Sequence, residues 1–242
     1  MKGSLTKRGK TSWRYRFDSN RHLGGSRKVI SGTIRSTTKK VAEEELRAIM
    51  AKHDKGDFVE PNKRTLKEYL EYWLPIIKPS IAPKTFEGDE QKVKKNIIPL
   101  LGHIRLQSLE MQQIEQAYAK LLTDGRDDGK GGLAPKTIRN IHGILSKALT
   151  KAVKWKYIAS NPATGAELPK AEPKELQILT KKDLALLLCE LEGRRIYMPV
   201  LIAATTGMRR GEILALKWSN VNLEEGWLRV VQSLEQTKEG CG

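Results

Sequence analysis

The sequence has few of the residues that build metal centres and disulfide frameworks. Its 242 residues include two cysteines, Cys189 and Cys241, and four histidines. Two cysteines are too few for a disulfide framework, and no histidine stands beside them at a ligand spacing. We therefore expect no metal site and no fold that depends on one.

Long apolar runs are also missing. No stretch approaches the ~20 residues that a membrane-spanning helix needs, and residues 1–5 lack the apolar stretch of a secretory signal. We expect no membrane contact and a cytoplasmic, reducing location. Because 39% of the residues are hydrophobic, the chain has enough apolar side chains for folded cores, and wholesale disorder is excluded.

Acidic residues are scarce relative to basic ones, and the imbalance is uneven. The chain has 44 lysines and arginines against 28 aspartates and glutamates, a net charge of +16. Residues 1–40 carry +11 and residues 63–170 carry +8, whereas residues 171–242 are neutral. Two basic modules followed by a neutral one suit two pieces that grip a polyanion such as DNA, joined to a third with another task. A solvated basic surface would give the same totals.

Aromatic and basic residues alternate near the N-terminus. Trp13, Tyr15 and Phe17 would lie on one face of a strand, and Arg14 and Arg16 on the other. The pattern predicts a half-buried strand that presents arginines, which is one way in which proteins read a DNA groove. A small solvated sheet would show the same alternation.

A second strand and a helix should complete this first module, which we place at residues 1–56. Residues 28–34 are rich in β-branched side chains, and their first residue, Lys28, is a further predicted DNA contact. Thr38 is the expected N-cap of a helix over residues 39–55. The module is therefore a small unit of two or three strands and one helix. The residues expected on the inward helix face are Val41, Leu46, Ile49 and Met50.

Four amphipathic helices are expected in a second module, at residues 64–162. The expected N-caps include Thr65 and Ser108. Pro75 and Pro79 are expected to break the first helix, and Pro99 and Gly102 are expected to stop the second. Four short helices in about 100 residues predict a compact bundle. The helices are expected at residues 65–74, 82–98, 108–125 and 135–153, with aperiodic linkers at residues 57–64 and 163–177.

Basic and small polar residues gather at two of these helix starts. The starts also expose backbone N–H groups, which together with the cations suit phosphate binding. A single lysine on a helix is usually a solvated charge, so only the cluster is informative. The predicted DNA contacts of the second module are Lys84, Thr85, Lys95, Lys136, Thr137, Arg139 and Asn140.

The third module, at residues 175–242, should begin with two apolar helices. Thr180 is expected to cap the first, in which Cys189 is a small core residue, and the second covers residues 198–204. Gly207 should end the second helix in a conformation that other residues resist. The buried face of the first helix is predicted to contain Leu184, Leu187, Leu188 and Leu191.

Arg209 stands at the start of the helix that follows. This helix, from about residue 210, should turn Ile213, Leu214 and Leu216 inward. A guanidinium held at its entrance can donate two parallel hydrogen bonds to a phosphate, and Glu212 is near enough to orient it. By physical chemistry alone, the two residues could equally be a structural helix pair.

The segment from Thr206 to Trp218 resembles the first conserved box of the tyrosine recombinases, the phage and transposon integrases. It reads TGMRRGEILALKW against the family pattern T-G-x-R-x-x-E-[IL]-x-x-L-x-W. Residues 1–56 resemble the arm-site-binding domain of these integrases, residues 64–162 their SAM-like core-binding domain, and residues 175–242 the opening of their catalytic domain. The resemblance implies a mainly α fold with a small N-terminal α+β domain and an incomplete α+β catalytic domain.

The resemblance also implies DNA strand exchange without a metal or nucleotide cofactor. In the family, a tyrosine attacks the scissile phosphate to give a 3′-phosphotyrosyl link. Two arginines, a hairpin lysine, and histidine or tryptophan groups stabilise the transition state. Arg209 matches the first arginine and Glu212 its supporting acid. The implied partner is double-stranded DNA at arm-type and core-type sites, with self-association on DNA and a nucleoid location when bound.

The chain also departs from the family pattern. No histidine and no tyrosine follows Arg209, so the second box and the nucleophile have no counterpart. Residues 227–234 should form a strand of the family's hairpin, and Lys238 falls on its first limb rather than at the lysine position. We expect the N-terminal part of an integrase, which binds DNA without cleaving it. A DNA-binding regulator that occupies recombination sites is an alternative, and the box disfavours a general nucleic-acid binder.

Overall fold

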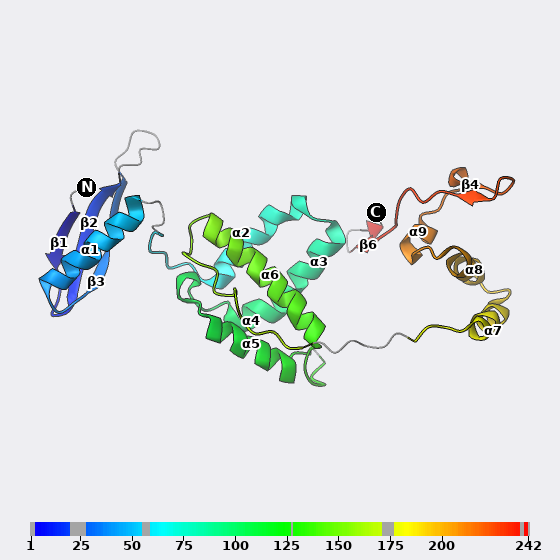
Figure 1. Ribbon diagram of the computed structural model, residues 1–242, viewed down its shortest axis with the longest axis horizontal. Coiled ribbons are helices and arrows are strands. Elements are labelled where there is room, and N and C mark those ends of the chain that lie inside the picture. The colour runs from blue at the N-terminus through cyan, green and yellow to red at the C-terminus, as the bar shows by residue number, and fades with distance from the viewer. Residues whose placement is uncertain are drawn as a thin grey trace. The chain divides into compact units, whose positions relative to one another are not determined.

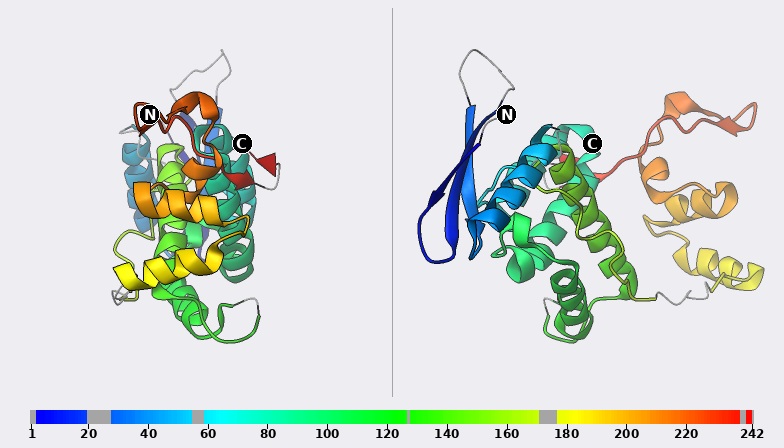
Figure 2. Two further views of the ribbon diagram at one scale, coloured as in Figure 1. Left: turned by 90° about the vertical axis from the view of Figure 1, so that its right-hand side faces the viewer. Right: turned by 60° about the vertical axis from the view of Figure 1, so that its left-hand side comes forward.

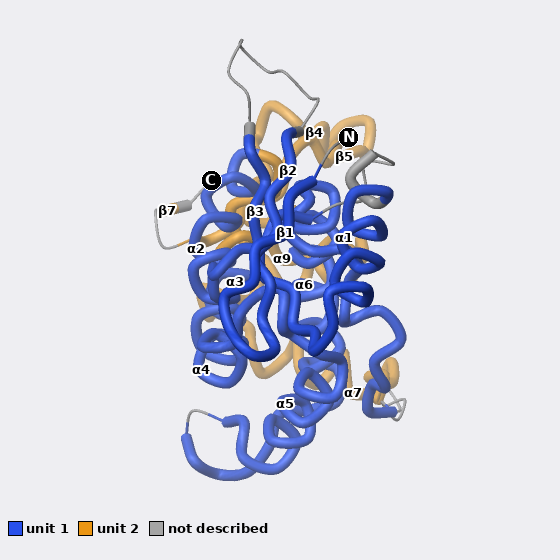
Figure 3. The backbone as a smooth tube through the Cα atoms, turned by 90° about the vertical axis from the view of Figure 1, so that its left-hand side faces the viewer, with its two compact units in different colours: residues 1–79, 89–171 blue, residues 80–88, 172–242 orange. Residues whose placement is uncertain are grey.

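The computed structural model divides the chain into two compact units (Figure 3). The first comprises Met1–Pro79 and Asp89–Ala171, and the second comprises Ser80–Gly88 and Glu172–Gly242. No helix in the described part of the chain is long and apolar enough to cross a membrane. The structure describes residues 3–19, 28–54, 59–126, 128–170, 177–237 and 240–241.

A three-stranded antiparallel sheet opens the first unit. Strands β1 (Gly3–Lys7), β2 (Ser12–Ser19) and β3 (Lys28–Arg35) lie in the order β1-β2-β3, with β2 in the centre. Helix α1 (Lys39–Asp54) covers one face of the sheet, as Figures 1 and 2 show. The α+β module is confirmed. The sequence pattern predicted two or three strands and gave no position for the third, which is β1.

The inward face of β2 carries the aromatic residues, as the alternation predicted. Trp13, Tyr15 and Phe17 are 2–8% exposed and pack against α1. The ring of Tyr15 crosses Gly32 on β3, where a Cβ would lie 2.5 Å from the Tyr15 Oη, so this position requires glycine. The other buried members of this core are Ile30, Ile34, Ala42 and Leu46.

One residue of α1 was placed on the wrong face. Val41 is 50% exposed, whereas the neighbouring Ala42 is fully buried. The inward stripe therefore runs through Ala42 and Leu46, with Ile49 and Met50 partly buried beside it. These positions follow the helical spacing more closely than Val41 does. The small side chain of Ala42 also lets the helix backbone approach the sheet.

The helical part of the chain contains the four predicted helical segments, the second of which is interrupted. Its elements are α2 (Leu66–Ile77), the 3₁₀ turn η1 (Lys78–Ser80), α3 (Pro83–Lys92), the π-helical turn η2 (Val93–Ile97), α4 (Ile98–Leu101), the 3₁₀ turn η3 (Leu106–Ser108), α5 (Met111–Asp124) and α6 (Pro135–Lys154).

Helices α2 and α6 provide much of the core of this part. Tyr69 on α2 is fully buried, and its hydroxyl donates a 2.7 Å hydrogen bond to the Ala148 carbonyl on α6. Burial raises the pKa of the Tyr69 hydroxyl far above its ordinary value, so the group stays protonated and keeps donating. Other residues with at most 1% exposure include Leu66, Leu70, Trp73, Ile138, Ile141, Leu145 and Leu149.

Pro79 and Gly102 follow the ends of α2 and α4, as predicted, whereas Pro75 and Pro99 lie inside helices. Pro75 lies inside α2, which continues to Ile77, and Pro99 lies in the first turn of α4. The helix runs without a break from α3 through η2 into α4, and the π-helical turn just before Pro99 interrupts the regular hydrogen-bond ladder. Near the end of a helix, as at Pro75, only one bond is lost, and the buried face of α2 offsets it.

The predicted N-cap of α5 was also wrong. Its N-cap is Glu110 rather than Ser108, and the Glu110 N–H donates to Gln113 Oε1 at 3.0 Å. Ser108 instead ends the turn η3. Leu121 fills the inward position at the end of the helix. Leu122, next to it in the sequence, is 38% exposed.

The C-terminal region, Gln177–Cys241, has short elements and little buried surface. The predicted cap is present, because the Asp183 N–H donates to Thr180 Oγ1 at 3.2 Å. Gly207 ends α8 at a φ of 70°, also as predicted. The elements are α7 (Lys181–Leu191), α8 (Tyr197–Thr206), α9 (Arg210–Leu214), the turn η4 (Trp218–Asn220), β4 (Val221–Asn222), β5 (Trp227–Leu228), β6 (Gln236–Thr237) and β7 (Gly240–Cys241).

None of the side chains predicted to be buried in these helices is fully buried, and most of them are half-buried. Leu187 and Leu214 are 38% and 57% exposed, and Cys189 is exposed rather than a core residue. Among the described residues after 176, Ala215 alone is a buried hydrophobic residue. Few described residues pack over these helices, and an apolar face is buried only where a neighbour covers it.

The predicted strand at residues 227–234 is much shorter. Only Trp227 and Leu228 form β5, which pairs with β4, and the chain from 229 to 235 is irregular. Strand β6 pairs with β7 instead. Lys238 lies outside the described residues.

Candidate nucleic-acid interface

The outward face of the N-terminal sheet is cationic and rich in hydroxyl groups. Arg14 and Arg16 on β2 are exposed, opposite the buried aromatic residues. The register places Arg14 between Thr6 and Thr33, and Arg16 between Ser4 and Ser31. Each arginine thus has a hydroxyl residue on both neighbouring strands, and all four hydroxyl residues are exposed.

This arrangement can bind a polyanion over a flat area. Guanidinium groups donate to phosphate oxygens or base edges, and serine and threonine hydroxyls donate to phosphate. The sheet core holds the arginine backbones in place, while their long side chains remain free to adjust. Lys28, also predicted to contact DNA, begins β3, but its side chain lies outside the described residues.

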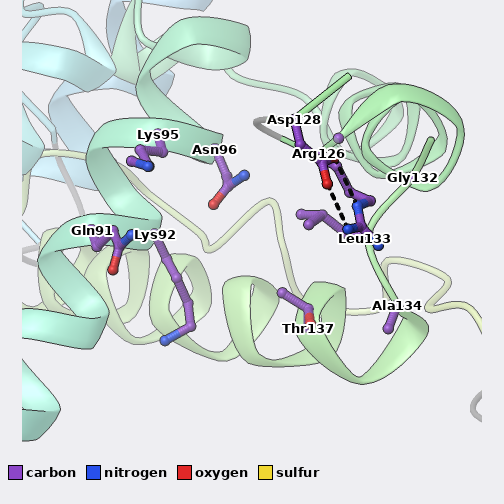
Figure 4. A pocket seen from close by; sticks show the side chains of 11 residues that line it. Gln91, Lys92, Lys95, Asn96, Arg126, Asp128, Gly132, Leu133, Ala134 and Thr137 are labelled. Atoms are coloured by element: carbon purple, nitrogen blue, oxygen red, sulfur yellow. Dashed lines mark hydrogen bonds and ion pairs between the residues drawn. The ribbon is translucent and has the colours of Figure 1, made fainter. Parts of the chain in front are cut away.

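A groove of about 530 Å³ in the first unit joins the second helical segment to the start of α6 (Figure 4). Lys92 and Lys95 line one wall, and Thr137 lines the other. Sequence analysis predicted contacts at Lys95 and Thr137 on separate helices, and the structure brings the two residues to one groove. The remaining lining residues are Gln91, Asn96, Gly125, Arg126, Asp128, Gly132, Leu133 and Ala134.

Arg126 is held at this groove by an ion pair. Its Nη2 and Nε lie 2.7 and 3.0 Å from the two carboxylate oxygens of Asp128. Hydrogen bonding from Arg126 holds the pKa of Asp128 below its ordinary value. A side chain at Gly132 would overlap the Leu122 carbonyl, so glycine lets the loop pass close to α5. With three cations and one carboxylate, the groove lining attracts anions.

The other predicted contacts at the start of α6 have different surroundings. Lys136 and Asn140 are exposed. Arg139 is also exposed, but its Nε donates a 3.0 Å hydrogen bond to the Pro169 carbonyl. Part of its guanidinium therefore holds the segment that follows the bundle, and only the remaining N–H groups are available to a ligand.

Lys84, at the start of α3, already has protein partners. Its Nζ donates a 2.8 Å hydrogen bond to the Gln236 carbonyl and lies 3.8 Å from Glu87 Oε2. Thr85 beside it is exposed. Lys84 would have to exchange the Gln236 contact for a phosphate contact.

Arg209 precedes α9 with its guanidinium in solvent. Its side chain is 86% exposed, and Nη1 lies 3.0 Å from Glu212 Oε1. The Arg209 N–H also donates to Glu212 Oε2 at 2.8 Å. Hydrogen bonds from the backbone and then the side chain of Arg209 lower the pKa of Glu212, which stays ionised and orients the arginine. The free edge of the guanidinium can still donate to a phosphodiester.

Sequence analysis missed several residues of both surfaces. The hydroxyl rows on β1 and β3 could have been found from their period-two spacing around Leu5 and Gly32. Gln91, Asn96 and Arg126 line the groove with no local signal, because elements far apart in the chain form it.

Comparisons with known proteins point to one family. Residues 65–122 match the phage integrase N-terminal SAM-like domain. An integrase from Saccharopolyspora erythraea is 31% identical over 182 residues, which is 73% of this chain and 40% of the relative. A XerC-like tyrosine recombinase from Caldanaerobacter subterraneus is 28% identical over 246 residues, or 97% of this chain and 60% of the relative. The chain thus spans 40% and 60% of the lengths of these relatives.

Solved integrase structures share the fold. The Tn1549 transposon integrase in complex with circular intermediate DNA aligns with a TM-score of 0.61 at 19% identity, over 74% of this chain and 58% of that chain. A lambda integrase dimer bound to a COC′ core site aligns with a TM-score of 0.56 at 22% identity, over 66% and 56%. At these identities, the likeness concerns the fold alone.

Proposed function

The chain belongs to the tyrosine recombinase family, and from this premise we propose that it binds double-stranded DNA in the integration and excision of a mobile element. The proposal assigns one DNA surface to the sheet and another to the helical part. The chain has two basic modules before a neutral one, and each basic module would bind its own DNA site. No cofactor is needed for this binding.

The sheet is proposed to bind arm-type sites. The observation that carries the proposal is the outward face of β2, where Arg14 and Arg16 each stand between hydroxyl residues of the neighbouring strands. Such a face can lie in a DNA groove with its arginines on base edges and its hydroxyls on the backbone. Lys28 belongs to the same proposed surface.

The helical part is proposed to bind core-type sites through the groove. Lys92 and Lys95 supply charge, and the backbone N–H groups at the start of α6 supply donors beside Thr137. Lys136, Arg139 and Asn140 extend the proposed surface along α6, and Lys84 and Thr85 contribute at the start of α3. The domain boundaries at residues 1–56, 64–162 and 175–242 remain part of the proposal.

Arg209 is proposed to clamp the scissile phosphate, with Glu212 as its support. The relatives are named integrase and XerC-like tyrosine recombinase, and the segment TGMRRGEILALKW resembles the first conserved box of that family. No tyrosine follows Arg209 in the 242 residues. A polypeptide of this sequence is therefore proposed to bind DNA without forming a covalent link to it.

Two measurements test the proposed function. Fluorescence anisotropy should show binding to labelled duplex DNA that a duplex RNA competes for poorly, and RNA competing equally well would restore a general nucleic-acid binder. A suicide DNA substrate should leave no covalent complex, and a covalent complex would overturn the assignment of the missing nucleophile.

A DNA-binding regulator is the second candidate, because DNA binding by the sheet and the groove does not require strand cleavage. Such a regulator would occupy recombination sites and exclude a complete integrase. Adding the chain to a recombination reaction run by a full-length relative discriminates the two roles. A regulator suppresses recombination at concentrations near that of the enzyme.

A further inference from the structure

The segment that leads into the helical part is docked against it, although its sequence predicts a linker. The backbone of Arg64 and Thr65 runs antiparallel to the turn before α5. The Leu106 N–H donates to the Arg64 carbonyl at 2.9 Å, and the Leu66 N–H donates to the Ile104 carbonyl at 2.8 Å. Thr65 and Arg105 form an isolated antiparallel bridge. The incoming segment, residues 59–65, is thus attached before α2 begins.

The side chain of Gln107 joins this segment to the chain that leaves α6. Its Oε1 accepts a 3.0 Å hydrogen bond from the Asn62 N–H, and its Nε2 donates to the Glu60 carbonyl at 2.8 Å. The same Nε2 donates to the Tyr157 carbonyl at 3.0 Å. A primary amide can accept through its oxygen and donate both N–H groups, and Gln107 does all three here.

A second set of contacts joins the same two segments. The guanidinium of Arg64 lies 5.3 Å from the ring centroid of Tyr72 and 5.0 Å from that of Tyr157. Arg64 Nη1 is buried and has no hydrogen-bond partner among the described residues. The aromatic faces are therefore the principal neighbours of this nitrogen, as in a cation–π contact. Tyr157 therefore contacts both residues: its carbonyl accepts from Gln107, and its ring faces the guanidinium of Arg64.

Apolar residues line the space between the two segments. A groove of about 270 Å³ lies there, with Val59 and Pro61 from the incoming segment and Ile158 and Pro162 from the outgoing one. Gln107 itself lines the groove. The polar contacts of Gln107 and the stacked Arg64 thus act on segments that already face each other.

We propose that Gln107 is a positioning residue for DNA binding, which fixes the place where the chain from the N-terminal sheet joins the helical part. Together with Arg64 it fastens residues 59–64 to Tyr157, and so shortens the stretch of chain that separates the two proposed DNA surfaces. The inference rests on the proposed function, because it requires that both surfaces bind DNA.

The number of residues between the two surfaces sets how strongly they cooperate in binding one duplex. When one surface has bound, the other binds the same duplex at an effective concentration that falls roughly as the −3/2 power of the tether length. Releasing residues 59–63 adds five residues to that tether, because the Leu106 N–H still holds the Arg64 carbonyl. Binding that uses both surfaces should weaken, whereas binding that uses one surface should not.

A double-mutant cycle on the full chain tests this. Gln107→Leu removes all three hydrogen bonds of the amide, and Arg14→Ala/Arg16→Ala removes the sheet surface. Gln116→Leu, at an exposed position of α5, is the matched control. The probe is a labelled duplex of mixed sequence, about 40 base pairs or roughly four helical turns long.

The expected result is a background-dependent effect. In the chain that keeps Arg14 and Arg16, Gln107→Leu should weaken binding roughly two- to fivefold. In the Arg14→Ala/Arg16→Ala background, Gln107→Leu should change nothing, and Gln116→Leu should change nothing in either background. If Gln107→Leu weakens binding equally in both backgrounds, or in neither, the positioning role is wrong. If Arg14→Ala/Arg16→Ala has no effect by itself, the sheet surface of the proposed function fails instead.

Hydrogen exchange confirms that the substitution acts where it should. The Asn62 amide should be protected in the unmodified chain and lose protection in Gln107→Leu, while amides of α6 stay protected. Gln107→Glu keeps an acceptor for the Asn62 N–H and removes both donations, so it should keep the Asn62 protection and still lose the cooperative binding. Unchanged Asn62 exchange in Gln107→Leu would contradict the proposed contact.

Discussion

The helical part and the C-terminal region differ in what holds their helices. In the helical part, α2 and α6 bury long apolar faces, with Tyr69 and Leu145 fully buried. In the C-terminal region, helices of similar apolar content leave Leu187 and Leu214 exposed, and local signals such as the Thr180 cap define their ends. The difference shows that local sequence can place a helix without deciding what its apolar face packs against.

The largest expected effect is on the free energy of unfolding, and it differs between the helical part and the C-terminal region. Leu145→Ala, at a fully buried site, should lower the free energy of unfolding by about 2–5 kcal/mol, because it removes contacts and leaves a cavity. Leu214→Ala, at a site that is 57% exposed, should change it by less than about 0.5 kcal/mol. Urea denaturation followed by tryptophan fluorescence measures both. Equal losses would mean that the C-terminal region buries more surface than the structure describes.

A second test compares the two regions in DNA binding. Lys92→Ala/Lys95→Ala should reduce the slope of log affinity against log salt by about 2, because each lost phosphate contact contributes about 0.9. Arg194→Ala/Arg195→Ala removes the same charge from exposed positions of the C-terminal region and should leave the slope unchanged. Anisotropy titrations at several salt concentrations provide the slopes. Equal changes of slope in both variants would mean that the groove lysines act only through the net charge of the chain.

The helix N-caps of the two regions allow a third comparison, with a smaller expected change in stability. Thr65 and Thr180 accept from the backbone of Glu68 and Asp183 in the same geometry. Replacing either threonine with alanine should cost about 1 kcal/mol of helix stability. Thr65→Ala should appear in the unfolding of the helical part, whereas Thr180→Ala should appear only as faster hydrogen exchange in α7. A shift of the main unfolding transition by Thr180→Ala would show that the two regions unfold together.

The smallest effect concerns pH at the Arg209–Glu212 contact. Arg209 lowers the pKa of Glu212, so the contact contributes above the ordinary carboxyl pKa of about 4.3 and is lost as the pH falls through the lowered value. A carbon-detected NMR titration should show the Glu212 carboxyl titrating below its ordinary range. Arg209→Ala should return its pKa only part of the way toward the ordinary value, because the variant loses the side-chain hydrogen bond and keeps the backbone one. An unchanged Glu212 titration in that variant would contradict the orienting role of the carboxylate.

Sequence analysis placed the features that depend on a few neighbouring residues. The alternation of Trp13, Tyr15 and Phe17, the cap at Thr180 and the left-handed Gly207 are confirmed, because each is encoded within one turn or strand. Pro75 and Val41 show the limit of such signals. Burial of the rest of α2 overrides a helix-breaking residue, and a shift of one residue moves a side chain from core to solvent.

The features that could not be predicted depend on contacts between distant residues. The groove combines Lys92 with Thr137, and Gln107 combines Asn62 with Tyr157. Neither set has a periodic pattern. The exposure of Cys189 likewise depends on which elements cover α7, which its own sequence does not state. Residue type alone suggested a core position there.

The salt dependence of duplex binding by Arg14→Ala/Arg16→Ala tests the central claim most directly. If the sheet is a DNA surface that works beside the groove, the variant should bind a long duplex more weakly, and its slope against log salt should fall by up to about 2. The slope should stay well above zero, since the groove still binds. An affinity and a slope equal to those of the unmodified chain would contradict the account.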